Sequence, residues 1–199
     1  MNLKSAEEYI YEKLQKNLSP TLTYHGFHHT LDVVDIAMKI AKAEGVQDEE
    51  SLILLKTAAL YHDLGFITTY KGHEEESCRI AALSLPKMGY SALQLDAICG
   101  MIMATKIPQH PKNLLEKIIA DADLDYLGRE DFEPIANALF LELREREMVV
   151  GLETWNKIQV NFLENHHFWT KSTILLRNKN KAKRLQELKA IVATYSITS

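Results

Sequence analysis

The sequence lacks any long hydrophobic run: no stretch approaches the ~20 apolar residues with which a helix crosses a bilayer. Its first eight residues are polar and acidic, without the apolar segment of a signal peptide. Sustained alternation of β-branched and polar residues, the pattern of strands, is absent, as are internal repeats and low-complexity segments. These absences predict an all-α protein that makes no membrane contact and is located in the cytoplasm.

Cysteine is also scarce, and basic residues are fewer than acidic ones. Cys78 and Cys99 have neither CxxC spacing nor a disulfide framework, so we interpret both as buried free thiols in a reducing compartment. A formal net charge of -4 argues against general nucleic-acid binding. Residues 171–189 are the exception, with seven basic residues against one acidic residue. A solvated helix face, an acidic partner, a nucleic-acid contact and packing against the acidic remainder of the chain are all open for this stretch.

Helical periodicity and capping residues predict nine helices. Ser5 and Glu8 match the capping-box pattern at the start of the first helix. Asp48 is expected to cap the third helix and Ser91 the fifth. Residues 66–72 are predicted to form a loop.

At 199 residues, the chain is expected to form one helical-bundle domain. The motifs described below occupy about residues 24–128. The C-terminal helices, residues 131–195, are expected to pack on that core.

Three separate segments offer side chains that suit a divalent cation: His28-His29, His62-Asp63 and the pair Asp121 and Asp123. Gly65 closely follows the His-Asp pair, and a glycine-opened turn at a helix end would let these two neighbours converge. Each segment has an ordinary alternative: a His-Asp hydrogen bond, surface histidines, or a solvated acidic turn. Asp123, however, lies in an apolar frame, where a buried carboxylate is costly unless it is paired or bound to a metal.

The order His29, His62-Asp63, Asp123 resembles the HD superfamily of metal-dependent phosphohydrolases. Tyr61-His62-Asp63-Leu64-Gly65 resembles its "HD-hydrophobic-G" signature, and the stretch from Asp121 to Asp125 resembles its "DAD" segment. The resemblance implies a helical HD-type domain with His29, His62, Asp63 and Asp123 as metal ligands, and Asp121 and His28 as fallback ligands. It implies one or two divalent ions, with iron, manganese, magnesium, zinc, nickel and cobalt all open.

The segment Tyr24-His25-Gly26-Phe27-His28-His29 is also similar to a Tyr-His-Asn-aromatic-x-His stretch of cyclic-nucleotide phosphodiesterases. In that comparison His29 falls on a metal ligand, and His25 falls on the histidine that protonates the leaving oxygen. Gly26 replaces that family's asparagine, and the long flanking region that shapes its purine pocket is missing. A cyclic-nucleotide phosphodiesterase-like activity is therefore an alternative.

The superfamily resemblance implies hydrolysis of a phosphomonoester or phosphodiester, expected to be a small nucleotide-like substrate, by a water that the metal activates. Asp63 would also bridge to a second ion or receive the proton of that water. His73, Glu74 and Lys106 are candidates for a second ion or for the substrate phosphate. Their ordinary roles would be a helix-start histidine, compensation of the helix dipole and a surface cation. A non-catalytic sensor or scaffold that binds a metal or nucleotide is a further alternative.

Overall fold

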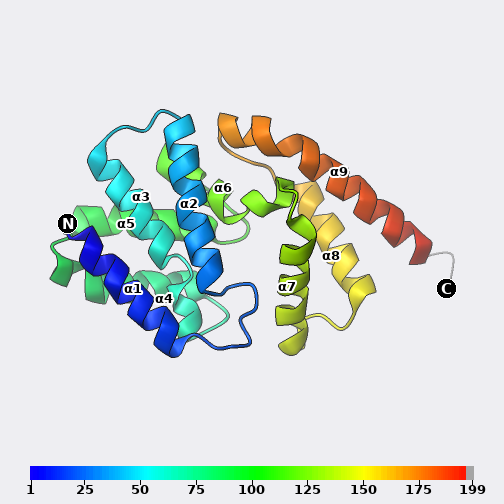
Figure 1. Ribbon diagram of the computed structural model, residues 1–199, viewed down its shortest axis with the longest axis horizontal. Helices are drawn as coiled ribbons and strands as arrows, with labels where there is room; N and C mark the ends of the chain where they lie inside the picture. The colour runs from blue at the N-terminus through cyan, green and yellow to red at the C-terminus, as the bar shows by residue number, and fades with distance from the viewer. Residues whose placement is uncertain (196–199) are drawn as a thin grey trace. The chain divides into compact units, whose positions relative to one another are not determined.

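The computed structural model describes residues 1–195, in which the chain forms α-helices joined by turns and short 3-10 helices, without any strand (Figure 1). The all-α prediction is confirmed. The chain divides into two compact units, one comprising Met1–Asp123 and the other beginning at Leu124. The expectation of one domain in which residues 131–195 pack on the core stays a prediction.

The first unit contains all the candidate metal ligands, the last of which is its final residue, Asp123. Its elements are α1 (Leu3–Asn17), α2 (Phe27–Ala43), α3 (Glu49–Tyr61), η1 (Leu64–Ile67), α4 (His73–Ser84), η2 (Leu85–Met88), α5 (Ala92–Thr105) and α6 (Leu114–Asp123). Helix α3 contacts α1, α2, α5 and α6, so neighbours surround it on several sides. A helix in that position must be apolar around most of its circumference, which explains the hydrophobic run before the His-Asp pair.

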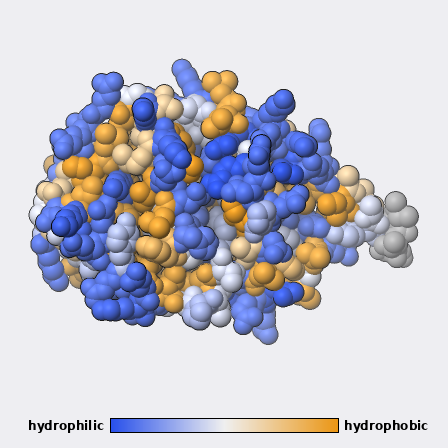
Figure 2. Space-filling view, viewed as in Figure 1, coloured by the Kyte–Doolittle hydropathy of each residue, from blue (hydrophilic) through white to orange (hydrophobic). Residues whose placement is uncertain are grey.

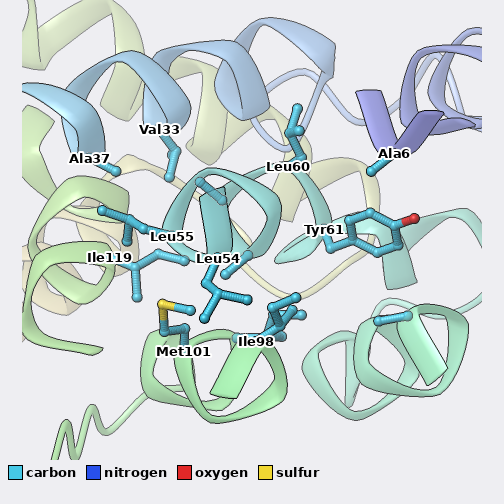
Figure 3. Packing of buried hydrophobic residues seen from close by; sticks show 14 of the residues in the cluster. Ala6, Val33, Ala37, Leu54, Leu55, Leu60, Tyr61, Ile98, Met101 and Ile119 are labelled. Atoms are coloured by element: carbon cyan, nitrogen blue, oxygen red, sulfur yellow. The ribbon is translucent and has the colours of Figure 1, made fainter. Parts of the chain in front are cut away.

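The core of the first unit is built around α3, as Figure 3 shows. Leu54 and Leu55 of α3 lie among side chains from three other helices. Those labelled in the figure are Val33 and Ala37 from α2, Ile98 and Met101 from α5, and Ile119 from α6. Burial continues to the end of the helix, since Leu60 and Tyr61 are no more than 1% exposed. The next residues, His62 and Asp63, are consequently buried as well.

Two predicted helix caps are confirmed. The side chain of Asp48 accepts a hydrogen bond from the backbone N–H of Ser51 at 2.8 Å. Ser91 and Gln94 form a complete capping box, in which each side chain accepts from the other residue's backbone N–H. Both caps satisfy N–H groups that the first turn of a helix leaves without intrahelical partners.

Two expectations about local structure are wrong. Helix α1 starts earlier than Ser5, because the side chain of Asn2 accepts from the Ser5 backbone N–H at 3.1 Å and caps the helix itself. Asparagine is as good an N-cap as serine, so the helix gains length by using the earlier residue. Residues 66–72 are also not loop throughout, since the 3-10 helix η1 covers Leu64–Ile67.

The second unit contains η3 (Asp125–Gly128), α7 (Phe132–Glu145), α8 (Leu152–Asn165) and α9 (Lys171–Tyr195). In it, the guanidinium of Arg177 donates two hydrogen bonds to the buried carboxylate of Asp125, at 2.7 and 2.9 Å. Gly128 allows this approach, because a Cβ there would lie 2.6 Å from the carbonyl oxygen of Arg177. Arg184 pairs with Glu187 and Lys189 with Glu164. Several basic residues of α9 are therefore paired within their own unit.

Replacing Arg177 by alanine is expected to destabilise the second unit by roughly 2 kcal/mol, because the buried Asp125 carboxylate would lose two short hydrogen bonds and keep the longer ion pair with Arg129, at 4.0 Å. Urea denaturation followed by circular dichroism measures the loss. Lys157→Ala is the matched control: its pair with Glu153 is largely exposed and should contribute little. Equal stability of the two variants would contradict the assignment of Asp125 to this buried ion pair.

No helix among the described residues is long and apolar enough to cross a membrane. Figure 2 shows hydrophobic residues interspersed with hydrophilic ones on the visible face. Exposed ion pairs one helical turn apart, such as Lys16 with Glu12 and Lys39 with Asp35, contribute to the hydrophilic surface. Exposed ion pairs of this kind contribute little to the free energy of unfolding, and their charged groups stay in contact with water.

Candidate metal centre

His62 and Asp63 lie where α3 stops and the chain changes direction. His62 keeps helical backbone angles (φ -54°, ψ -40°), whereas Asp63 leaves the helix (φ -104°, ψ 5°). Neighbouring side chains of a continuous helix diverge by about 100°, so this break is what lets the two face a common point. The Nε2 atom of His62 lies 3.2 Å from Oδ2 of Asp63. The expected convergence at the helix end is therefore observed.

Gly65 is required for a reason other than the conformational freedom expected from the sequence. The glycines with positive φ are Gly45, Gly72 and Gly89, and Gly65 is not among them. A Cβ at Gly65 would instead lie 2.8 Å from the carbonyl carbon of His73 and 2.9 Å from its Cα. The missing side chain lets the first turn of α4 approach the His-Asp turn.

Ser77 of α4 holds this turn in place through two hydrogen bonds, and no local sequence pattern indicates this role. Its hydroxyl donates to the carbonyl oxygen of His62 at 2.7 Å and accepts from the backbone N–H of Gly65 at 2.8 Å. Ser77 is fully buried, so both hydrogen bonds are shielded from water. They fix the backbone on both sides of Asp63.

Four side-chain atoms from three separate segments meet beside this turn. His29 Nε2 lies 3.1 Å from Asp123 Oδ1 and 3.4 Å from Asp63 Oδ2. His62 Nε2 lies 3.2 Å from Asp63 Oδ2 and 3.6 Å from Asp123 Oδ1. Ligands bound about 2.1 Å from one ion are separated by roughly 3.0–3.4 Å at octahedral or tetrahedral angles. The spacing therefore suits a single ion, and His29, His62 and Asp123 alone already form a group that could hold one.

Two of these atoms lack a hydrogen-bond partner although they are buried: Nε2 of His62 and Oδ2 of Asp63. The other ring nitrogen of His62, Nδ1, is satisfied by the carbonyl oxygen of Ala59 at 2.8 Å. This contact directs Nε2 toward the carboxylates, which is the usual support for a metal-binding imidazole. A buried polar atom left unpaired costs about 1–3 kcal/mol. Nitrogen and oxygen donors left open in this way fit a divalent cation.

The charges in the centre shift the protonation of its members strongly. Burial alone would lower the pKa of His62, but the carboxylates of Asp63 and Asp123 outweigh it and raise that pKa well above its usual value. Burial would raise the pKa of Asp63, yet His62 and the other nearby histidines hold it far below its usual range. Burial would also raise the pKa of Asp123, but the hydrogen bond with His29 and the nearby imidazole of His62 lower it to about 2. The directions of these pKa shifts favour ionised carboxylates beside a protonated His62 when no metal is bound.

Metal binding is consequently expected to release about one proton near neutral pH, because Nε2 of His62 must lose its proton to become a ligand. Affinity should fall as the pH is lowered, since protons then compete more strongly for the same nitrogen. Calorimetric titration with a divalent metal in two buffers of different ionisation enthalpy counts the protons released. A count of zero at pH 7 would contradict a protonated His62 in the metal-free centre.

A second group of side chains lies on the other side of Asp63. Its remaining oxygen, Oδ1, is 3.5 Å from Nε2 of His73, and the same nitrogen is 3.5 Å from Oε1 of Glu74. Glu74 is buried (7% exposed), which a residue that only compensates the helix dipole would not need to be. Asp63 therefore faces the first histidine pair with one oxygen and His73 with the other.

Phe66 packs against two histidines: His73, a member of this second group, and His25. Its ring stacks on His73 with 3.9 Å between centroids, and on His25 with 4.2 Å. His25 is partly exposed, and its charge contributes to the low pKa of Asp63. The sequence comparison singled out both histidines but missed the phenylalanine that lies between them in the chain.

Three other predicted residues are placed elsewhere. Lys106 is on the surface, where its ammonium forms an ion pair with the carboxylate of Glu75. His28 is exposed, and its ring lies over Gly26, where a Cβ would come within 2.8 Å of it. Asp121 is fully buried but is not part of the group formed by His29, His62 and Asp123. Of the alternatives left open by the sequence, the structure brings His29 and Asp123 to the centre.

Comparisons with known proteins agree with this geometry. No curated protein sequence matches the chain. Its fold is similar to the crystal structure of a predicted HD superfamily hydrolase from an uncultured Thermotogales bacterium. The TM-score is 0.60 at 21% sequence identity, over 98% of this chain and 93% of the other. The family model of the HD domain matches residues 26–125, a span that includes every candidate ligand described above. The chain therefore belongs to the HD domain family, whose general activity is metal-dependent phosphohydrolysis.

Proposed function

We propose that the protein hydrolyses a phosphomonoester or phosphodiester of a small, nucleotide-like compound, and that His29, His62, Asp63 and Asp123 hold the divalent ion it needs. The observation that carries this proposal is the convergence of four donor atoms, two of which are buried without a hydrogen bond. A bound ion supplies Lewis-acid chemistry, which lowers the pKa of a water and polarises a phosphoryl oxygen.

Asp63 is the residue that links the two sides of the site. Its Oδ2 faces the histidine pair, which leaves Oδ1 on the side of His73. If one ion is bound, Oδ1 is placed to accept the proton of the attacking water. If two were bound, Oδ1 of Asp63 together with His73 and Glu74 would hold the second. Metal stoichiometry decides between these roles, because a proton acceptor and a bridging ligand cannot share the same lone pair.

His25 is the candidate for protonating the leaving oxygen. It is partly exposed, so a substrate can reach it, and its ring lies 5.9 Å from that of His29 between centroids. Stacking on Phe66 restricts the orientation of its imidazole. An acid at this position would act on the substrate side of the centre, while Asp63 acts on the side of the water.

Chelation and reloading test the proposal. The purified protein is stripped of metal, reloaded with each of iron, manganese, magnesium, zinc, nickel and cobalt, and its metal content is measured. Each form is then incubated with nucleoside monophosphates, cyclic mononucleotides and generic phosphoesters. We expect many turnovers of at least one substrate, lost on chelation and restored by metal. Tight nucleotide binding without product would instead favour a sensor, and preference for cyclic diesters would favour the phosphodiesterase alternative.

A further inference from the structure

The chain's two cysteines, far apart in the sequence, face each other in the first unit. Cys78 lies on α4 and Cys99 on α5, 21 residues later. The sulfur of Cys78 lies 3.7 Å from the carbonyl oxygen of Cys99, and the sulfur of Cys99 lies 4.0 Å from the carbonyl oxygen of Cys78. This reciprocal contact requires the two residues to oppose each other across the α4–α5 pair.

Both thiols are free and partly exposed, which corrects the expectation that they are buried. Partial exposure matters, because a thiol that reacts with a small molecule must be reachable from solvent. The two helices are packed together, and each sulfur already lies within 4.0 Å of the other residue's backbone carbonyl oxygen, so the two thiols start close to each other. We propose that Cys78 and Cys99 form a dithiol modification site, which a small-molecule disulfide oxidises to an intramolecular disulfide.

The two sulfurs take successive parts in this reaction. Both thiols are partly exposed and their contacts are reciprocal, so either one can react first. The first thiol loses its proton to solvent, and its thiolate attacks one sulfur of the small disulfide and expels one thiolate. The second thiol then gives up its proton to solvent, attacks the mixed disulfide at the first and expels the second thiolate. Two protein thiols and one small disulfide become one protein disulfide and two small thiols.

The bond would tie together two helices next to the metal centre. Cys78 lies on α4, one helical turn after Glu74, and the same helix begins with His73. Linking residues 21 apart removes conformational freedom from the unfolded chain. For a loop of that size we expect the thermal midpoint to rise by roughly 5–10 °C. This device depends on the helix pair alone and is independent of the proposed hydrolysis.

The test uses the full chain in buffers that contain reduced and oxidised glutathione at a series of ratios. Since the chain has only two cysteines, the products are few. We expect a monomer on a non-reducing gel, a mass decrease of about 2 Da from loss of two hydrogens without a glutathione adduct, and the higher thermal midpoint. Reduction should reverse all three.

Cys78→Ser and Cys99→Ser serve as matched variants, because each keeps one thiol on the same helix pair. In the same oxidised buffer, each variant should stop at a glutathione adduct on its remaining cysteine, and neither variant should gain thermal stability. The proposal is overturned if the wild type accumulates glutathione on both cysteines, forms disulfide-linked dimers or stays reduced at every ratio. A disulfide that leaves the midpoint unchanged would overturn the claim that it closes on the native helix pair.

Discussion

An Asp63→Ala variant is expected to lose most of its bound metal and to hydrolyse substrate on the order of a thousandfold more slowly, or worse. Asp63 places one oxygen within 3.4 Å of both His29 and His62, and the other faces His73. Removing the carboxylate therefore affects both sides of the site at once. Metal analysis of the purified variant and the ratio kcat/KM measure the two losses, with circular dichroism to check that the variant is folded.

The adjacent histidines of α2 provide the sharpest control for this prediction. His29 is buried at the centre, whereas His28 is exposed and lies over Gly26. His29→Ala should therefore lose metal and activity as Asp63→Ala does, while His28→Ala should retain both. Full activity of Asp63→Ala, or equal losses in the two histidine variants, would show that the centre is not the one described.

Features with a local physical cause could be predicted from the sequence. Asp48 and Ser91 cap their helices as expected because a cap depends on residues within one turn. The first helix was misplaced for the same kind of reason, since two good caps, Asn2 and Ser5, compete three residues apart. The set of metal ligands was expected from the resemblance of His29, His62-Asp63 and Asp123 to the HD superfamily, because the residue types alone left an ordinary alternative for each segment.

What escaped prediction depends on how distant segments pack. The three glutamates that open α4 look equivalent in the sequence, yet Glu74 alone is buried beside His73. Ser77 carries no signal until α4 approaches the His-Asp turn. Cys78 and Cys99 likewise appear isolated until α4 and α5 lie side by side. In each case the helix itself was predicted from the sequence, but the segment that packs against it was not. The contacts with that segment determine what the side chain does.

Replacing Gly65 by alanine is expected to destabilise the first unit by roughly 3 kcal/mol and to disturb the second group of ligands. The added Cβ would meet the backbone of His73, 2.8 Å from its carbonyl carbon, and a backbone cannot rotate away as a side chain can. The first turn of α4 would have to move, which displaces His73 and stretches the hydrogen bonds from Ser77 to the His-Asp turn. Urea denaturation of the metal-free protein measures the stability, and metal titration measures the site.

Gly151→Ala is the matched control, because a Cβ there meets nothing within 4 Å and its backbone is extended (φ -165°). At this N-cap, alanine should cost less than about 1 kcal/mol. Comparing the two variants therefore separates the general effect of replacing a glycine by alanine from the steric clash at Gly65. If the two variants were equally stable and Gly65→Ala bound metal normally, the close approach of α4 would not be what holds the His-Asp turn. The ligand geometry would then depend on α3 and η1 alone.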